Sequence, residues 1–271
     1  MKHSIVIALL LVTAACDEDA GPGLPDAEDV TAEADDPTMD AVDDVEPADP
    51  AADMVEEEPG PDPCSIEGLV AAISQENMYA TLEVLSSFPE RTSFTGQQNA
   101  LEYLEDRLTG QGVEYQLHHY SWSGRTWANI EVILPGGDLE NEIYIAGGHY
   151  DSLSEYGNAP GADDNGSGTA ALVEMARVLG GCSFRRTVKL LFFSNEEAGI
   201  VGSTYYASEA RGRGDDIRGF LALDSIGYGA GGEDIDAVTL PDDAWLVDRV
   251  EAVSATYVGA PILKRVLDAC G

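Results

Sequence analysis

Four groups of side chains that can bind a divalent metal ion lie in one stretch of this sequence. Each group stands directly after an apolar run or at the start of a helix, the position at which open α/β sheets place their active sites. In such a site one carboxylate of an adjacent pair can bind the ion while its neighbour takes a proton from bound water. The groups are His149 with Asp151, Asp163 with Asp164, Glu196 with Glu197, and Asp224.

Taken singly, each group also has an ordinary structural interpretation. A histidine after a strand is often structural, acids at a helix start suit the helix dipole, and Asp224 could be a turn residue. In the loop 161–168, Asn165 or an aspartate could cap the following helix. Capping needs one such residue, whereas this glycine-rich loop holds two adjacent acids, which repel each other unless a cation holds them. All four groups fall at the same end of successive strands, and this convergence favours a metal site.

Short apolar runs separated by helical segments must position these groups. Ile143 to Ala146, Val188 to Phe193 and Phe220 to Leu223 are nearly continuous apolar runs, which is typical of parallel strands buried on both faces. Helices are expected between them, over Ser167 to Leu179 and from about Gly202 to Arg211. Strands that alternate with helices predict right-handed βαβ units and an α/β fold, with a doubly wound, mostly parallel sheet flanked by helices.

Further elements are expected on either side of this region, and no internal repeat is visible. Before it we expect helices and a β-hairpin, and after it one last helix with its apolar residues turned inward. The expected elements before it are helices over Ile66 to Ser87 (in two pieces) and from Thr95-Gly96 to Gly110, strands Val113 to Trp122 and Trp127 to Leu134, and a turn at Pro135 to Asp138. The expected helix after it spans Asp243 to Tyr257, with Leu246, Val250, Val253 and Tyr257 on its inward face.

Acidic residues outnumber basic ones by 50 to 14, and they are densest near the N-terminus. The net charge of -36 excludes a nucleic-acid-binding surface, which needs clustered Lys and Arg. Residues 17–63 hold nineteen Asp and Glu, eight Pro and no Lys or Arg. Such a segment cannot bury enough apolar surface to offset its ordering entropy, so we interpret it as a disordered linker. An acidic tail that binds calcium or a partner is the less favoured alternative.

The first sixteen residues have the pattern of an export signal. Lys2 precedes an apolar core that is too short to span a membrane, and Thr13-Ala14-Ala15-Cys16 resembles a bacterial lipobox. We expect Cys16 to be lipidated, so that the chain is exported and anchored to a bacterial membrane on its periplasmic or outer side. The alternative is an ordinary cleaved signal peptide and a secreted protein.

The folded domain is expected to begin near Cys64 and to extend to Gly271. In an oxidising compartment one disulfide is plausible, and Cys64 with Cys182 is the expected pair, with Cys270 left over. The cysteine spacing shows no metal-site pattern, and the sequence gives no indication of oligomeric state.

Between about Phe88 and Tyr257 the motifs are similar to those of a known enzyme family. GGHYDS, GADDNGSG, FFSNEEAG and LALDSIGY resemble the secreted bacterial leucyl-aminopeptidase family, the co-catalytic di-zinc aminopeptidases. The resemblance implies the zinc exopeptidase (phosphorylase/hydrolase-like) fold, two zinc ions, and hydrolysis of the N-terminal bond of peptides or proteins. It also implies a role for each matched residue: His149 and Asp224 bind one zinc, Asp164 bridges both, Glu197 binds the other, Glu196 is the general base, and Asp151 orients His149. In this family the peptide bond before the bridging aspartate, here Asp163-Asp164, is often cis.

The family carries one more zinc ligand, a histidine well downstream of the position of Asp224. All four histidines of this chain come earlier, and His118 and His119 are expected on a peripheral strand. We therefore expect the sequence to be C-terminally truncated relative to its relatives, with the last strand and helix missing. The residues present form a complete set for one zinc, His149 with Asp164 and Asp224, and leave the other zinc with Asp164 and Glu197.

Two other functions remain open at this point. One is a glutaminyl-cyclase-like acyltransferase, which shares the fold and works with one zinc. The other is a non-catalytic lipoprotein that binds peptides or merely retains the fold. The motifs GADDNGSG and NEEAG fit aminopeptidases better than glutaminyl cyclases, whereas the missing histidine favours an inactive protein.

Overall fold

The structure is a computed structural model that describes residues 61–153, 158–227 and 235–267. The expected signal peptide, the lipidation site at Cys16, nearly all of the acidic linker and Cys270 lie outside the described residues. Within the described ranges, every helix is too short or too polar to cross a membrane.

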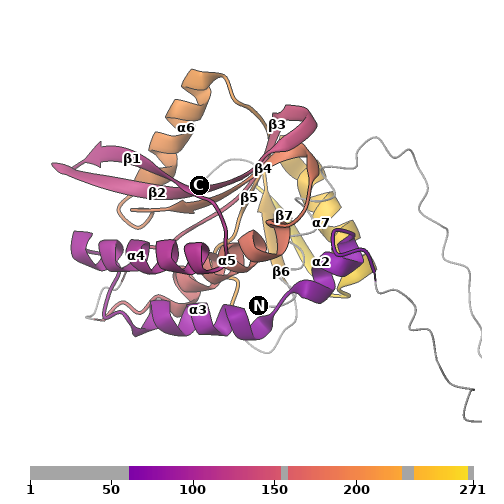
Figure 1. Cartoon of the computed structure of the whole chain (residues 1–271). Helices are drawn as coiled ribbons and strands as arrows, with labels where there is room; N and C mark the ends of the chain where they lie inside the picture. The colour runs from indigo at the N-terminus through magenta and orange to yellow at the C-terminus, as the bar shows by residue number, and fades with distance from the viewer. Residues whose placement is uncertain (1–60, 154–157, 228–234, 268–271) are drawn as a thin grey trace, which may run out of the picture. The chain divides into compact units, whose positions relative to one another are not determined.

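Five strands form one mixed sheet (Figure 1). Strand β3 is parallel to both β4 and β5, whereas β2 is antiparallel to β1 and to β4. The three apolar runs therefore lie side by side in the parallel half of the sheet, as their composition predicts. In sheet order the strands are β1 (Gln116–Trp122), β2 (Arg125–Leu134), β4 (Phe184–Phe193), β3 (Gly136–His149) and β5 (Asp216–Ala222).

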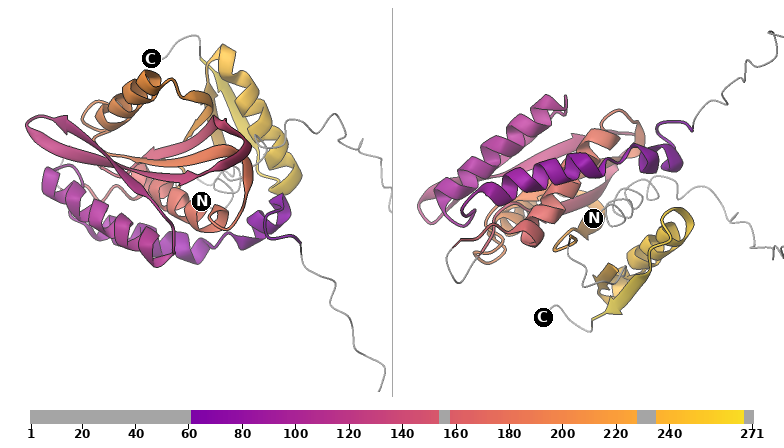
Figure 2. Two further views of the ribbon diagram at one scale, coloured as in Figure 1. Left: turned by 45° about the horizontal axis from the view of Figure 1, so that its top comes forward. Right: turned by 90° about the horizontal axis from the view of Figure 1, so that it is seen from below.

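Helices cover both faces of this sheet, which confirms the doubly wound α/β arrangement (Figures 1 and 2). On one face, the main core joins residues such as Met78, Leu104 and Leu172 to Ala146 and Leu190 of the sheet. On the other face, a smaller core packs α6 against β3 and β4. The helices of the first face are α2 (Ile66–Ala72), α3 (Gln75–Ser87), α4 (Phe94–Gly110) and α5 (Gly168–Leu179), and α6 spans Val201–Arg213.

A second, two-stranded sheet follows the main one and lies beside β5 (Figure 2). Its strands β6 (Ile235–Thr239) and β7 (Ile262–Val266) are parallel and are joined through a short 3₁₀ turn (Pro241–Asp243) and α7 (Ala244–Tyr257). Val250 of α7 packs against Leu221 of β5, so the inward face of α7 is the expected one. Neither of these strands was predicted, because both are short and largely exposed.

Three local features refine the sequence-based expectations. The turn expected at Pro135 to Asp138 is wrong: β3 already begins at Gly136, whose N–H donates to Thr187 Oγ1 at 3.1 Å. Strand β5 begins at Asp216, before its apolar run. The expected disulfide between Cys64 and Cys182 is confirmed and ties the start of the domain to the segment before β4.

Candidate metal centre

The imidazole of His149 lies at the centre of the predicted site. His149 ends β3, where two glycines precede it, and the residue is only 3 % exposed. Its Nε2 lies 3.2 Å from Asp164 Oδ1, 3.7 Å from Asp224 Oδ1 and 3.8 Å from Glu196 Oε2. Acids contributed by three separate loops therefore surround one ring nitrogen.

Two sets of three side chains bring their ligand atoms within 4.8 Å of one another, and both include His149. One set is His149 with Asp164 and Asp224, which is the complete zinc set expected from the sequence. In the other set Glu197 stands with His149 and Glu196, whereas the resemblance pairs Glu197 with Asp164. Imidazole nitrogen and carboxylate oxygen are ordinary zinc ligands, so both donor sets suit zinc.

Asp151 is buried behind this ring of ligands. Its Oδ1 accepts the backbone N–H of Glu196 at 3.0 Å and its Oδ2 accepts that of Glu197 at 3.1 Å. Oδ1 also lies 3.3 Å from Nδ1 of His149, within ion-pair distance although the pair does not meet hydrogen-bond geometry. One carboxylate thus contacts the histidine and both glutamates, which suits a group that orients ligands.

The adjacent acids Asp163 and Asp164 have different environments. Asp163 Oδ1 accepts the N–H of Gly227 at 2.7 Å, which ties this loop to the loop that carries Asp224. Asp164 instead faces His149. The cis peptide bond in this loop joins Asp164 to Asn165, so the expected position, Asp163-Asp164, was one residue too early.

Asn165 connects the same loop to its neighbours. Its Oδ1 accepts the N–H of Gly168 at 2.9 Å at the start of α5, and its Nδ2 donates to the carbonyl of Leu223 at 2.7 Å. The capping interpretation of this motif is therefore correct as well: Asn165 caps the helix while the two aspartates make other contacts.

Burial and mutual repulsion raise the pKa of three of the acids around His149. Partial burial is the larger cause for Asp164, Glu196 and Glu197, and neighbouring carboxylates add to it. Burial would lower the pKa of His149, but the carboxylates of Asp151 and Asp224 outweigh burial and raise that pKa to about 10. The imidazole in turn lowers the pKa of Asp224. A metal ion that binds at this site must therefore displace the proton of His149.

Arg91 contacts the loops of this site, and the sequence pattern does not reveal it. Its side chain is fully buried and donates to four main-chain carbonyls, those of Leu85, Tyr150, Pro160 and Gly161. Burial lowers its pKa to about 10, and the charges of nearby Asp151 and Asp164 limit the shift, so Arg91 remains a cation at neutral pH. Because Tyr150 and Gly161 flank the site, this cation supports the loops of His149 and Asp164.

His118 lies away from this site, as expected for a peripheral strand. It belongs to the edge strand β1, and its Nε2 lies 3.1 Å from Glu209 Oε2 of α6. Neither His118 nor His119 enters a candidate metal-binding group among the described residues.

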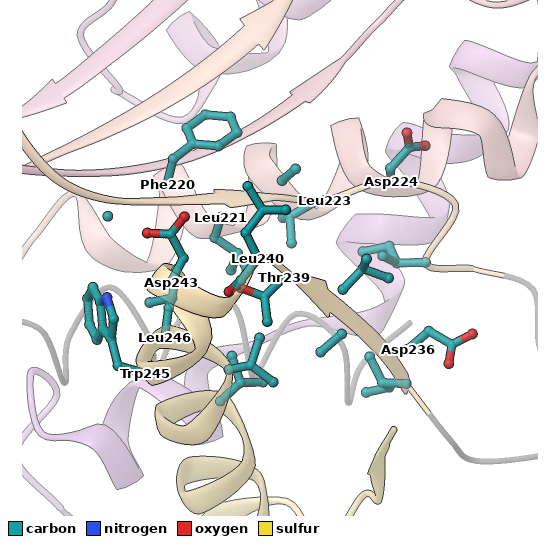
Figure 3. Close-up of a pocket in the computed structure, with 18 of the residues that line it drawn as sticks. Phe220, Leu221, Leu223, Asp224, Asp236, Thr239, Leu240, Asp243, Trp245 and Leu246 are labelled. Atoms are coloured by element: carbon teal, nitrogen blue, oxygen red, sulfur yellow. The ribbon is translucent and has the colours of Figure 1, made fainter. Parts of the chain in front are cut away.

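A cavity of about 620 Å³ opens beside Asp224, between β5 and the segment that runs from β6 to α7 (Figure 3). Asp224 lines one end, and Leu223, Leu240, Leu246 and Trp245 are among the mostly apolar residues that line the rest. The cavity therefore places an apolar space next to a candidate metal ligand.

Comparisons with known proteins place the chain in a peptidase family. The model of Peptidase family M28 matches residues 129–268, just over half of the chain. A probable zinc metalloprotease of Pyrenophora teres f. teres (strain 0-1) is 30% identical over 202 residues, covering 65% of this chain and 42% of that protein. Leucine aminopeptidase 1 of Paracoccidioides brasiliensis (strain Pb03) is 29% identical over 231 residues, covering 76% and 58%. The chain thus spans about half the length of these curated relatives.

Solved structures share the fold. LapA of Legionella pneumophila superimposes with a TM-score of 0.64 at 21% identity, over 76% of this chain and 58% of that one. A glutaminyl cyclase of Tannerella forsythia gives a TM-score of 0.57 at 18% identity, over 73% of this chain and 79% of that one. Both likenesses support the α/β fold.

Proposed function

The chain belongs to peptidase family M28, and we propose that it binds zinc at the ends of β3, β4 and β5 and removes N-terminal residues from peptides. One observation carries the proposal: three separate loops place carboxylates around the buried imidazole of His149. The names of the relatives, leucine aminopeptidase and zinc metalloprotease, support the same reaction class.

The residues around His149 would hold the metal. We assign a first zinc to His149, Asp164 and Asp224, and a second to Glu197 with Asp164 as the shared ligand. In this arrangement Asp151 keeps its contacts to His149 and to the main chain of both glutamates. Bound zinc supplies a Lewis acid for the scissile carbonyl and an activated water.

Glu196 is the proposed general base. Its side chain is partly exposed, lies beside His149, and has a pKa raised by partial burial and then by neighbouring acids. A carboxylate with a raised pKa is a stronger base toward water than an ordinary one, and once protonated it can pass the proton to the leaving amine. The N–H of Glu196 is held by Asp151, which fixes the start of this side chain.

The test uses the full chain, with zinc content measured by elemental analysis and turnover by release of p-nitroaniline from Leu-p-nitroanilide. We expect bound zinc and hydrolysis, and we expect Glu196→Gln to retain the zinc while losing about 10²- to 10⁴-fold in rate. Glu83→Gln, at an exposed position of α3, is the matched control. A Glu196→Gln variant with a near-normal rate would remove Glu196 from the role of base, and a chain that binds no zinc would overturn the proposal.

A glutaminyl-cyclase-like reaction, which needs one zinc, is the second candidate, because both candidate metal-binding groups among the described residues share the single histidine His149. Cyclisation of a peptide with N-terminal glutamine, without release of p-nitroaniline, would favour this reaction. Zinc binding with neither reaction would favour a non-catalytic protein.

We also propose that the chain is exported and lipidated at Cys16. The support is the sequence pattern of the first sixteen residues. Palmitate labelling in a bacterial host should mark the wild-type chain but not Cys16→Ala; an unlabelled wild type would contradict the proposal.

A further inference from the structure

The two glutamates of the site follow a residue with an unusual backbone conformation. Asn195, directly before Glu196, has a φ of 55°, in the left-handed region that few residues other than glycine adopt readily. It is only 1 % exposed. The direction in which the chain leaves β4 toward Glu196 and Glu197 is set at this position.

Each polar group of Asn195 has a partner. Its N–H donates to Gln97 Oε1 at 3.3 Å, and its Oδ1 accepts from Gln97 Nε2 at 3.0 Å. Its Nδ2 donates to the hydroxyl of Tyr120 at 2.8 Å, and its carbonyl accepts from Val201 at 3.0 Å. Gln97 therefore binds both the main chain and the side chain of the left-handed residue.

Gln97 comes from a distant part of the sequence. It lies in the first turn of α4 and is 1 % exposed, and its Nε2 also contacts the carbonyl of Thr92 at 3.3 Å. A primary amide is suited to this position because it offers an acceptor and donors at one end of an uncharged side chain. An aliphatic side chain of equal length would leave buried groups of Asn195 without these hydrogen bonds, which is costly in the interior.

We propose that Gln97 is a positioning residue for Glu196 and Glu197. By bonding to Asn195 it fixes the left-handed turn, while Asp151 accepts the N–H groups of the next two residues. The two contacts together aim both carboxylates toward His149. This inference rests on the proposed zinc function, and it adds a residue that no metal or substrate needs to touch.

The first experiment compares Gln97→Met with Gln98→Met in the full chain. Gln98 is the next residue on α4 and only partly buried, so it is the matched control. We expect Gln97→Met to weaken zinc binding about 10-fold and to lower kcat about 10- to 100-fold, with little change in KM, because misplaced ligands reduce affinity and rate to this extent. The control should stay within about twofold of wild type.

A second variant distinguishes a general loss of stability from misplacement of Glu196 and Glu197. Leu108→Ala removes a fully buried side chain from the far end of α4 and should lower stability without affecting the zinc affinity. A loss of zinc affinity equal to that of Gln97→Met would overturn the positioning role.

A double-mutant cycle tests whether Gln97 acts through Asn195. Glycine adopts the left-handed conformation without a side-chain penalty, so Asn195→Gly keeps the turn accessible. If Gln97 acts through this residue, Gln97→Met should have a smaller effect in the Asn195→Gly background than in wild type. Equal effects in both backgrounds would contradict the inference.

A measurement on the metal-free chain distinguishes failure of this inference from failure of the proposed zinc function. The backbone amide signals of Glu196 and Glu197 can be followed by NMR in the metal-free chain. We expect Gln97→Met to shift or broaden them even if the wild type neither binds zinc nor hydrolyses peptides. Signals that coincide with those of Gln98→Met would overturn the positioning role, whatever the activity of the chain.

Discussion

Replacement of Arg91 by lysine keeps the positive charge and removes the planar arrangement of donors. The guanidinium reaches carbonyls in different directions: Nε contacts Tyr150 at 2.8 Å, Nη1 contacts Leu85 at 2.9 Å and Pro160 at 2.5 Å, and Nη2 contacts Gly161 at 2.9 Å. A lysine ammonium has its three donors on one atom and cannot reach this whole set.

At least two of these carbonyls should therefore lose their charged donor. A hydrogen bond to a charged group contributes about 1.5–3 kcal/mol, so we expect the free energy of unfolding to fall by about 3–6 kcal/mol in Arg91→Lys. Arg125→Lys is the matched control, because the guanidinium of Arg125 is exposed and lies 4.6 Å above the ring of Phe94. Its loss should stay below about 1 kcal/mol.

Urea unfolding of the full chain, followed by circular dichroism and tryptophan fluorescence, measures both variants. The slope of the unfolding free energy against urea should be unchanged, since the folded structure buries the same surface. If Arg91→Lys lost no more stability than Arg125→Lys, the four contacts would be energetically unimportant, and the supporting role assigned to Arg91 would be wrong.

Three further outcomes follow from the structure. Gly161→Ala should lower stability by about 1–3 kcal/mol and weaken zinc binding, because φ is 48° and the added Cβ would lie 2.5 Å from two other atoms. Calorimetry measures the loss of stability, and Gly110→Ala, where the added Cβ meets open space, is the control. Burial raises the pKa of Glu131, but hydrogen bonds from a lysine, a tyrosine and a glutamine outweigh burial and lower it below 4.5. The Glu131 carboxylate should therefore stabilise the folded state above pH 4.5, and this contribution should be lost as the pH falls through the lowered pKa. In urea titrations at acid pH, the unfolding free energy of Glu131→Gln should fall less steeply with decreasing pH than that of wild type. An equally steep fall would contradict this role. Replacing Cys64 and Cys182 by serine should lower the free energy of unfolding by about 2–5 kcal/mol, measured by urea unfolding without reductant. A smaller effect would mean that the disulfide restricts the unfolded chain little.

The sequence was most informative where the residues of the site follow buried strands. His149, Glu196 and Asp224 each come within three residues of the end of an apolar run, and parallel strands bring such positions to one edge of the sheet. The strand β3 was predicted too short, because its first residues are polar and glycine-rich and contact β4 through main-chain pairing and through polar side chains, such as Asp138 with Arg185. Hydrophobic patterns do not detect such pairing.

The residues that support the site were not predictable in the same way. Arg91 and Gln97 act through main-chain carbonyls and through Asn195, and they precede the metal-binding stretch by more than a strand and a helix. Their partners are fixed by tertiary packing, so neither residue type nor spacing indicates them. Asp151 could be predicted because its partner His149 is two residues away, yet its bonds to the glutamates depend on the pairing of β3 with β4.

The crossover connections between β3, β4 and β5 also bear on the order of events during folding. The candidate ligands lie on loops that meet only when these parallel strands have paired, and parallel pairing requires long segments of chain to close first. We expect the candidate metal site to be assembled late in folding, after the rate-limiting barrier has been crossed. Zinc should consequently leave the rate of refolding almost unchanged and slow the rate of unfolding, so that its stabilisation is expressed as a longer lifetime of the native state.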